Sequence, residues 1–112
     1  MPDGQRRRQR NVLSEVTPGN GDATTVRRRV LVHGHVQAVG FRASCLRRAV
    51  EAGVGGWVRN TERGDVEAVF EGPPPAVEAL VAWCREGPPW ARVDYVETSD
   101  EPLGRETAFR IR

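Results

Sequence analysis

The chain has 112 residues, enough for one domain with a modest core. All seventeen basic residues are Arg and fifteen residues are acidic, so the net charge is only +2. Residues 25–112 hold thirteen Arg against twelve acids, a net charge of +1. This small excess argues against a nucleic-acid-binding surface. No apolar run approaches the roughly 20 residues of a membrane-spanning helix.

Residues 1–24 are polar and lack a sustained hydrophobic period, so we expect a disordered extension before a folded domain over residues 25–112. The cluster Arg6–Arg8 could be a nucleic-acid-binding arm, but charges in such a tail are more often simply solvated. No apolar segment of a secretory signal follows the basic start, and two cysteines make no disulfide framework. A cytoplasmic protein is expected.

Residues 27–34 alternate with the period of a strand, with Val30 and Val32 on one face and Arg29, Leu31 and His33 on the other. Residues 42–53 then show the period of an amphipathic helix. Its expected apolar stripe runs at i, i+3, i+4 and i+7 through Leu46, Ala49, Val50 and Gly53. A helix C-cap is expected at the last of these.

Residues 54–60 and 65–71 are expected to form a hairpin with a turn at residues 61–64, which contains Gly64. The second of these strands has an apolar face, made by Val66, Ala68 and Phe70, and a largely acidic face, made by Asp65, Glu67, Val69 and Glu71. A second helix over residues 75–86 follows. Its buried stripe is expected to contain Val77, Leu80, Val81 and Cys84.

Strands over residues 92–98 and 108–112, separated by a polar turn, complete the order β-α-β-β-α-β plus one short strand. This order predicts an α+β fold of the ferredoxin-like split βαβ type, with two helices on one face of a mostly antiparallel sheet. The first and third strands are expected side by side in the middle of the sheet. Because this fold hosts many functions, the site has to decide among them.

The turn between the first strand and the first helix has the features of an anion site. Gly34 and Gly40 bracket it, and Arg42 stands where the helix should begin. Backbone N–H groups that converge near a helix N-terminus attract anions. An arginine at the rim can bind two phosphate oxygens at once. The sequence therefore predicts a phosphate-binding loop.

Several stretches resemble signatures of the acylphosphatase family. Residues 34–42 read G-H-V-Q-A-V-G-F-R, similar to that family's G-x-V-Q-G-V-G-F-R loop, and residues 56–60 read G-W-V-R-N like its second signature. Residues 61–67 follow that signature's continuation, x-x-D-G-x-V-E, and residues 87–93 resemble its G-P-x-x-A-x-V segment. The resemblance covers roughly residues 26–112.

The resemblance implies hydrolysis of an acyl phosphate to a carboxylate and inorganic phosphate, with no metal and no other cofactor. By position, Arg42 would bind the transferred phosphoryl group, and Asn60 would orient the attacking water. The loop backbone would cradle the phosphate through Gln37, Ala38, Val39, Gly40, Phe41 and Arg42. These roles are physically consistent, because a mixed anhydride has a good leaving group and needs mainly positioning and charge stabilisation.

The chain departs from the family pattern at two positions. Ala38 replaces the first loop glycine, which costs on the order of 1 kcal/mol if the position needs a positive φ and nothing otherwise. Arg63 replaces the Asp of the hairpin turn, where Gly64 still supplies the permissive position. The second change should affect the hairpin rather than the chemistry.

Other residues with chemical potential have simpler interpretations. His33 and His35 could be metal ligands, and His35 a general base, but two side chains leave a zinc site two ligands short. Cys45 and Cys84 are expected as buried thiols; a disulfide between the helices is conceivable but disfavoured in a cytoplasm. The tryptophans are expected in core and rim packing rather than a substrate cage: Trp57, Trp83 and Trp90.

Two alternatives remain open at this point. A non-catalytic module of the same fold could bind an anion or RNA, but an RNA-recognition sheet needs exposed aromatics, and the central strands offer only Phe70 on a face expected to be buried. The chain also resembles the N-terminal acylphosphatase-like domain of a carbamoyltransferase used in hydrogenase maturation. Because the sequence ends at Arg112, a free-standing, monomeric enzyme is expected, and the acyl group of its substrate is not specified.

Overall fold

The computed structural model describes residues 24–112, so the expectation for residues 1–23 lies outside the described residues. In chain order, the elements are β2 (Val26–His35), α1 (Phe41–Ala52), β3 (Gly55–Asn60), β4 (Val66–Gly72), α2 (Pro74–Glu86), β5 (Arg92–Asp100) and β6 (Phe109–Ile111). All seven lie within two residues of the expected boundaries. Neither helix of the described chain is long and apolar enough to cross a membrane.

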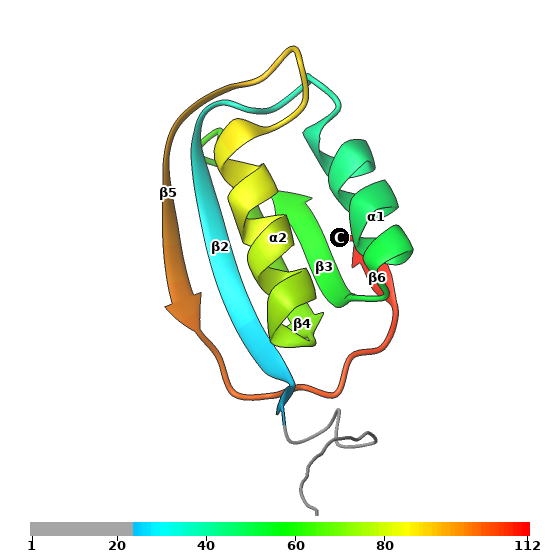
Figure 1. Ribbon diagram of the computed structural model, residues 1–112. Helices are drawn as coiled ribbons and strands as arrows, with labels where there is room; N and C mark the ends of the chain where they lie inside the picture. The colour runs from blue at the N-terminus through cyan, green and yellow to red at the C-terminus, as the bar shows by residue number, and fades with distance from the viewer. Residues whose placement is uncertain (1–23) are drawn as a thin grey trace, which may run out of the picture.

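The strands form one five-stranded sheet in the order β5-β2-β4-β3-β6. Its pairs are antiparallel except for β3 and β6, which run parallel. Both helices lie across the same face of this sheet, as Figure 1 shows. The predicted ferredoxin-like α+β fold is therefore confirmed, including the central pairing of β2 with β4.

Helix α1 starts one residue earlier than expected, and its buried face differs from the predicted one. The buried residues are Phe41, Cys45 and Ala49, whereas Val50 is 61% exposed. The ring centroids of Phe41 and Trp83 lie 5.0 Å apart, so aromatic packing against α2 determines the rotation of α1. The expected C-cap is confirmed, since Gly53 has a φ of 70° and ends the helix.

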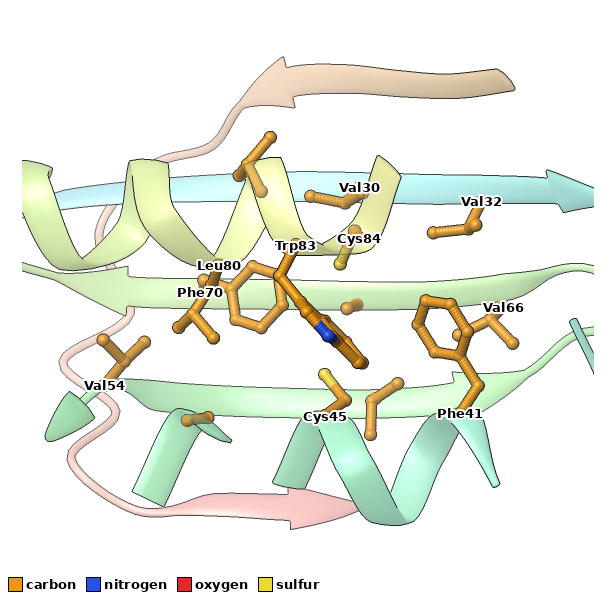
Figure 2. Close-up of a cluster of buried hydrophobic side chains, with 14 of the residues drawn as sticks. Val30, Val32, Phe41, Cys45, Val54, Val66, Phe70, Leu80, Trp83 and Cys84 are labelled. Carbon is orange, nitrogen blue, oxygen red and sulfur yellow. The ribbon is translucent and has the colours of Figure 1, made fainter. Parts of the chain in front are cut away.

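Helix α2 buries the predicted stripe and adds Trp83 to it. Figure 2 shows that the core lies between the helices and the sheet, with Phe41, Phe70 and Trp83 as its large members. The rings of Phe70 and Phe109 stack with centroids 5.7 Å apart, which ties the last strand to the core. Each such buried apolar side chain contributes about 1.5–3 kcal/mol relative to an exposed one.

Strand β4 is buried on both faces, including the one that carries carboxylates. Glu67 is only 6% exposed, because the guanidinium Nε groups of Arg29 and Arg59 bind its two carboxylate oxygens at 2.5 Å and 2.7 Å. Burial by itself raises the pKa of Glu67, but the two guanidiniums lower it more, so the pKa lies below its usual value. The acidic face is thus neutralised by arginines from the neighbouring strands.

A second buried carboxylate, Glu71, lies near the opposite end of the same strand and is 4% exposed. It accepts hydrogen bonds from the backbone N–H groups of Gly104, Arg105 and Glu106 and from Nη1 of Arg27, the last at 2.7 Å. Burial raises the pKa of Glu71, but these donors lower it more, and the net pKa is below its usual value. The loop before β6 is folded around this anion.

Candidate active site

The candidate site lies where two parallel strands end. Strands β2 and β3 each pair antiparallel with β4, so they point the same way and their C-terminal ends meet at one end of the sheet. The connection from β2 to α1 and the tip of β3 lie at this end in Figure 1. The loop after β2 and Asn60 at the end of β3 are therefore neighbours, although they are far apart in the sequence.

A hollow of about 210 Å³ opens between these segments. Its walls come from the loop, the start of α1, the end of β3 and β6, namely Val36, Ala38, Gly40, Phe41, Arg42, Ala43, Asn60 and Ile111. The structure thus brings Arg42 and Asn60 together, as the sequence predicted. Gln37 and Val39 do not line the hollow; Val39 instead packs against the core.

The loop backbone leaves a row of hydrogen-bond donors unused. Ala38 and Gly40 both have left-handed conformations, with φ of 62° and 80°. The first helical hydrogen bond runs from the N–H of Ser44 to the carbonyl of Gly40. Within residues 24–112, no backbone N–H from Ala38 to Ala43 donates to a backbone carbonyl. Donors of this kind at a helix N-terminus form a favourable environment for an anion.

The sequence left open whether position 38 needs a positive φ, and the structure shows that it has one. An L-residue with a side chain pays about 1–2 kcal/mol in this region, and glycine pays almost nothing. The alanine therefore places strain in the loop that a glycine would not. Gly64 has a φ of 92° in the hairpin turn, as expected for the position after Arg63.

The side chains of Arg42 and Asn60 have no partners within the part of the chain that the structure describes. Across residues 24–112, the guanidinium of Arg42 makes no ion pair or hydrogen bond, and the side-chain amide of Asn60 makes no hydrogen bond. Both residues are half-buried. An unpaired, partly buried cation beside free N–H groups is suited to binding an anion that comes from outside the chain.

The side chain of Gln37 has a contact that the sequence analysis missed. Its Nε2 donates to the backbone carbonyls of Thr61 and Asp65, at 2.8 Å each, and so joins the loop to the β3–β4 hairpin. The only signal in the sequence was a polar residue between two valines, Val36 and Val39; the structure shows that these valines pack inward and that Gln37 is half-buried. A buried amide of this kind is expected to be hydrogen-bonded.

The histidines do not converge on a common ligand. The Nδ1 of His33 lies 3.2 Å from a carboxylate oxygen of Asp65, and its Nε2 lies 2.6 Å from one of Glu97. The ring also stacks on Tyr95 with a centroid distance of 4.2 Å. His35 follows a register shift in β2 and is exposed.

The cysteines are free and buried, as predicted. The neighbouring Cys84 thiol and burial raise the pKa of Cys45 well above its usual value, which keeps it a protonated, unreactive thiol. Among the tryptophans, Trp83 is in the core and Trp57 packs under the Arg112 guanidinium, 4.3 Å from its ring centroid. Trp90 is 82% exposed, so it belongs to the rim rather than the core.

Comparison with known proteins gives a consistent result. A profile of the acylphosphatase family matches residues 28–111. The chain is 55% identical over 89 residues to an acylphosphatase from Rubrobacter xylanophilus, covering 79% of this chain and 81% of the relative. The chain belongs to the acylphosphatase family. It is a hydrolase with acylphosphatase activity, and its substrates are acyl phosphates.

Solved acylphosphatases have the same fold. An acylphosphatase from Coxiella burnetii superposes with a TM-score of 0.80 at 35% identity, covering 85% of this chain and 100% of that one. An acylphosphatase from Bacillus subtilis superposes with a TM-score of 0.75 at 32% identity, covering 78% and 98% of the two chains.

Proposed function

We propose that the enzyme hydrolyses its acyl phosphate in the hollow between the loop and Asn60. The phosphoryl group would be bound by the loop N–H groups and by Arg42, while Asn60 directs the water. The observation that carries this proposal is that one hollow is lined by both Arg42 and Asn60, whose side chains make no ion pair or hydrogen bond with the rest of residues 24–112. The substrate phosphate would be the anion that satisfies both the guanidinium and the N–H groups from Ala38 to Ala43.

Arg42 has the chemistry for stabilising the charge on the phosphoryl oxygens. Its guanidinium is permanently charged and can bind two oxygens in a planar fork. In a partly buried hollow, such preorganised donors act against less solvent screening than in water. Removal of one preorganised donor typically costs about 10²–10³ in kcat. We expect an effect of at least this size for Arg42.

Asn60 cannot remove a proton, but its side-chain oxygen can accept a hydrogen bond from water. In the proposed step, the water oxygen attacks phosphorus opposite the acyl oxygen, and the phosphorus–oxygen bond to the acyl group breaks. The carboxylate leaves with the electron pair, and the water proton passes to a phosphoryl oxygen. Positioning therefore replaces general base catalysis, as suits a good leaving group.

The test measures hydrolysis of benzoyl phosphate in the presence of a metal chelator. We expect turnover by the wild type and near-complete loss in Arg42→Gln and Asn60→Ala, with unchanged circular dichroism and thermal unfolding. Arg63→Gln is the matched control, because Arg63 is exposed in the hairpin and should be silent. Ordinary activity in both site variants would refute the assignment of the site.

We further propose that the enzyme acts as a monomer in the cytoplasm and does not bind nucleic acid. Both cysteines are free thiols, and residues 25–112 have a net charge near zero. Light scattering should report the mass of one chain. A nucleic-acid titration at moderate salt should show no binding, and saturable binding would contradict this part of the proposal.

A further inference from the structure

The amide of Gln37 is the feature of the site that the proposed chemistry does not use. Its Nε2 donates to two backbone carbonyls, of Thr61 and Asp65, at 2.8 Å each. Both hydrogens of the amide group are thereby directed at the hairpin rather than into the hollow. We propose that Gln37 is a positioning residue that holds Asn60 in register with the phosphate-binding loop. This inference rests on the proposed function of Asn60.

The two carbonyls that Gln37 binds are those that close the hairpin. The carbonyl of Asp65 also accepts the N–H of Thr61 at 2.9 Å, and the carbonyl of Thr61 accepts the N–H of Gly64 at 3.3 Å. The Thr61 hydroxyl accepts the N–H of Asp65 at 3.1 Å. Gln37 therefore holds both ends of a turn that is already closed by its own hydrogen bonds, and the turn moves with it as a unit.

Asn60 immediately precedes this turn and forms the last pair of β3 with Val66 of β4. Its side chain has no hydrogen bond within the described residues, so the position of its amide follows from its backbone alone. A tilt of the hairpin would move Asn60 relative to Arg42, which is fixed on α1. Misplacement by about 1 Å can cost on the order of 10²-fold in rate.

His33 also contacts the hairpin, through the carboxylate of Asp65. That contact comes from strand β2 and reaches a side chain, whereas Gln37 comes from the loop itself and reaches the backbone on both sides of the turn. Gln37 thus links directly the two segments whose separation sets the geometry of the hollow. Its own backbone N–H is untouched by any change to its side chain.

The experiment compares Gln37→Met, which keeps the length but removes the donors, with Gln37→Glu, which places carboxylate oxygens against two carbonyl oxygens. Assays are run below the melting temperature of each variant. We expect kcat for benzoyl phosphate to fall about 10- to 100-fold in both variants, and further in Gln37→Glu. The inhibition constant of inorganic phosphate should stay at the wild-type value, because the loop N–H groups and Arg42 are intact.

A double-mutant cycle then tests whether Gln37 acts through Asn60. At enzyme concentrations that make the residual turnover of Asn60→Ala measurable, we expect Gln37→Met to cause no further loss of kcat in the Asn60→Ala background, and Arg63→Ala to be silent in both backgrounds. Full additivity of the losses, a raised inhibition constant for phosphate, or an unchanged kcat in both Gln37 variants would each overturn the positioning role. Wild-type activity of Asn60→Ala alone would instead overturn the proposed function, so the two failures are distinguishable.

Discussion

Both ends of the sheet combine a guanidinium with backbone N–H groups, but they differ in whether the described chain supplies a carboxylate to bind them. At one end, a guanidinium and three backbone N–H groups surround the carboxylate of Glu71, an anion supplied by the chain itself. At the other end, Arg42 and residues Ala38, Gly40, Phe41 and Ala43 line a hollow, and their backbone N–H groups donate to no backbone carbonyl within residues 24–112. The first arrangement is complete and contributes to stability. The second needs an external anion, and that need is the basis of the proposed substrate binding.

The two ends of the sheet also resemble each other in their backbone conformation. Each end contains a non-glycine residue in the left-handed region, Arg105 with a φ of 59° beside Glu71 and Ala38 with a φ of 62° in the loop. The N–H of Arg105 donates to Glu71, whereas Ala38 lines the hollow and its N–H donates to no backbone carbonyl within residues 24–112. The two ends differ in whether the chain itself supplies the anion. Removing a partner of Glu71 should therefore destabilise the fold, whereas removing Arg42 should abolish ligand binding.

The largest expected effect is on the free energy of unfolding, through the arrangement around Glu71. Arg27→Gln leaves the carboxylate of Glu71 without its guanidinium partner, while Glu106 keeps a contact to Arg110 at 3.4 Å. Breaking a buried pair by removing one partner costs about 3–5 kcal/mol. Urea unfolding should show this loss, while kcat per folded molecule stays at the wild-type value.

Arg92→Gln is the control for that measurement, because its pair with Asp94 is exposed and worth no more than about 1 kcal/mol. A loss of kcat in folded Arg27→Gln would contradict the prediction that the end of the sheet around Glu71 contributes to stability alone.

The next largest effect is on the stabilisation of the fold by phosphate bound beside Arg42. Inorganic phosphate at a concentration 100 times its dissociation constant should stabilise the wild type by about 2.7 kcal/mol. Arg42→Gln should lose most of this stabilisation at the same concentration, with a phosphate-free stability within about 0.5 kcal/mol of the wild type. Thermal unfolding with and without phosphate measures both quantities. Equal stabilisation of the two proteins would show that phosphate binds elsewhere.

Acid should weaken the fold through Glu67 and Glu71. Their pKa values are lower in the folded protein than the ordinary value of about 4.3, so their stabilisation is complete above that pH. As the pH falls through the lowered folded pKa values, the stabilisation is lost. The free energy of unfolding should therefore decline below about pH 4.3. Glu71→Gln should flatten this decline, and a slope identical to the wild type would contradict the pairing.

The smallest effect tests the two strained residues. Ala38→Gly and Arg105→Gly should each raise the free energy of unfolding by about 1 kcal/mol, because glycine tolerates the left-handed backbone. Ala82→Gly, in the exposed interior of α2, should instead lower it by about 1 kcal/mol. Chemical denaturation measures all three. Destabilisation by Ala38→Gly would mean that the strain is not relieved.

Local patterns were sufficient for most of the fold and for a candidate anion-binding loop that ends at Arg42, whereas only the motif resemblance singled out Asn60. The strand alternation, the Gly and Pro boundaries and the stripe of α2 depend on neighbours within a few positions, and the structure confirms them. Arg42 at the start of α1 and Asn60 at the end of β3 lie close because β2 and β3 run parallel, so the loop after β2 and the tip of β3 meet at one end of the sheet. Motif resemblance assigned them roles, which stay proposals.

Other features depended on contacts that no local pattern contains. The rotation of α1 follows from the packing of Phe41 on Trp83, so Val50 is exposed despite its apolar character. The carboxylate of Glu67 is buried because arginines from two other strands neutralise it. The side chain of Gln37 binds a hairpin 24 residues away in sequence.

The sequence by itself thus determined the order of the elements and the family, whereas the phosphate-binding loop that it predicts stays a proposal. The tertiary structure alone decided that Ala38 is left-handed, that the loop N–H groups have no partner in the described chain and that Glu71 occupies a comparable arrangement at the other end. The physical reason is that periodicity reports which residues prefer burial. Which donors remain unsatisfied is known only when every potential partner has been placed in space.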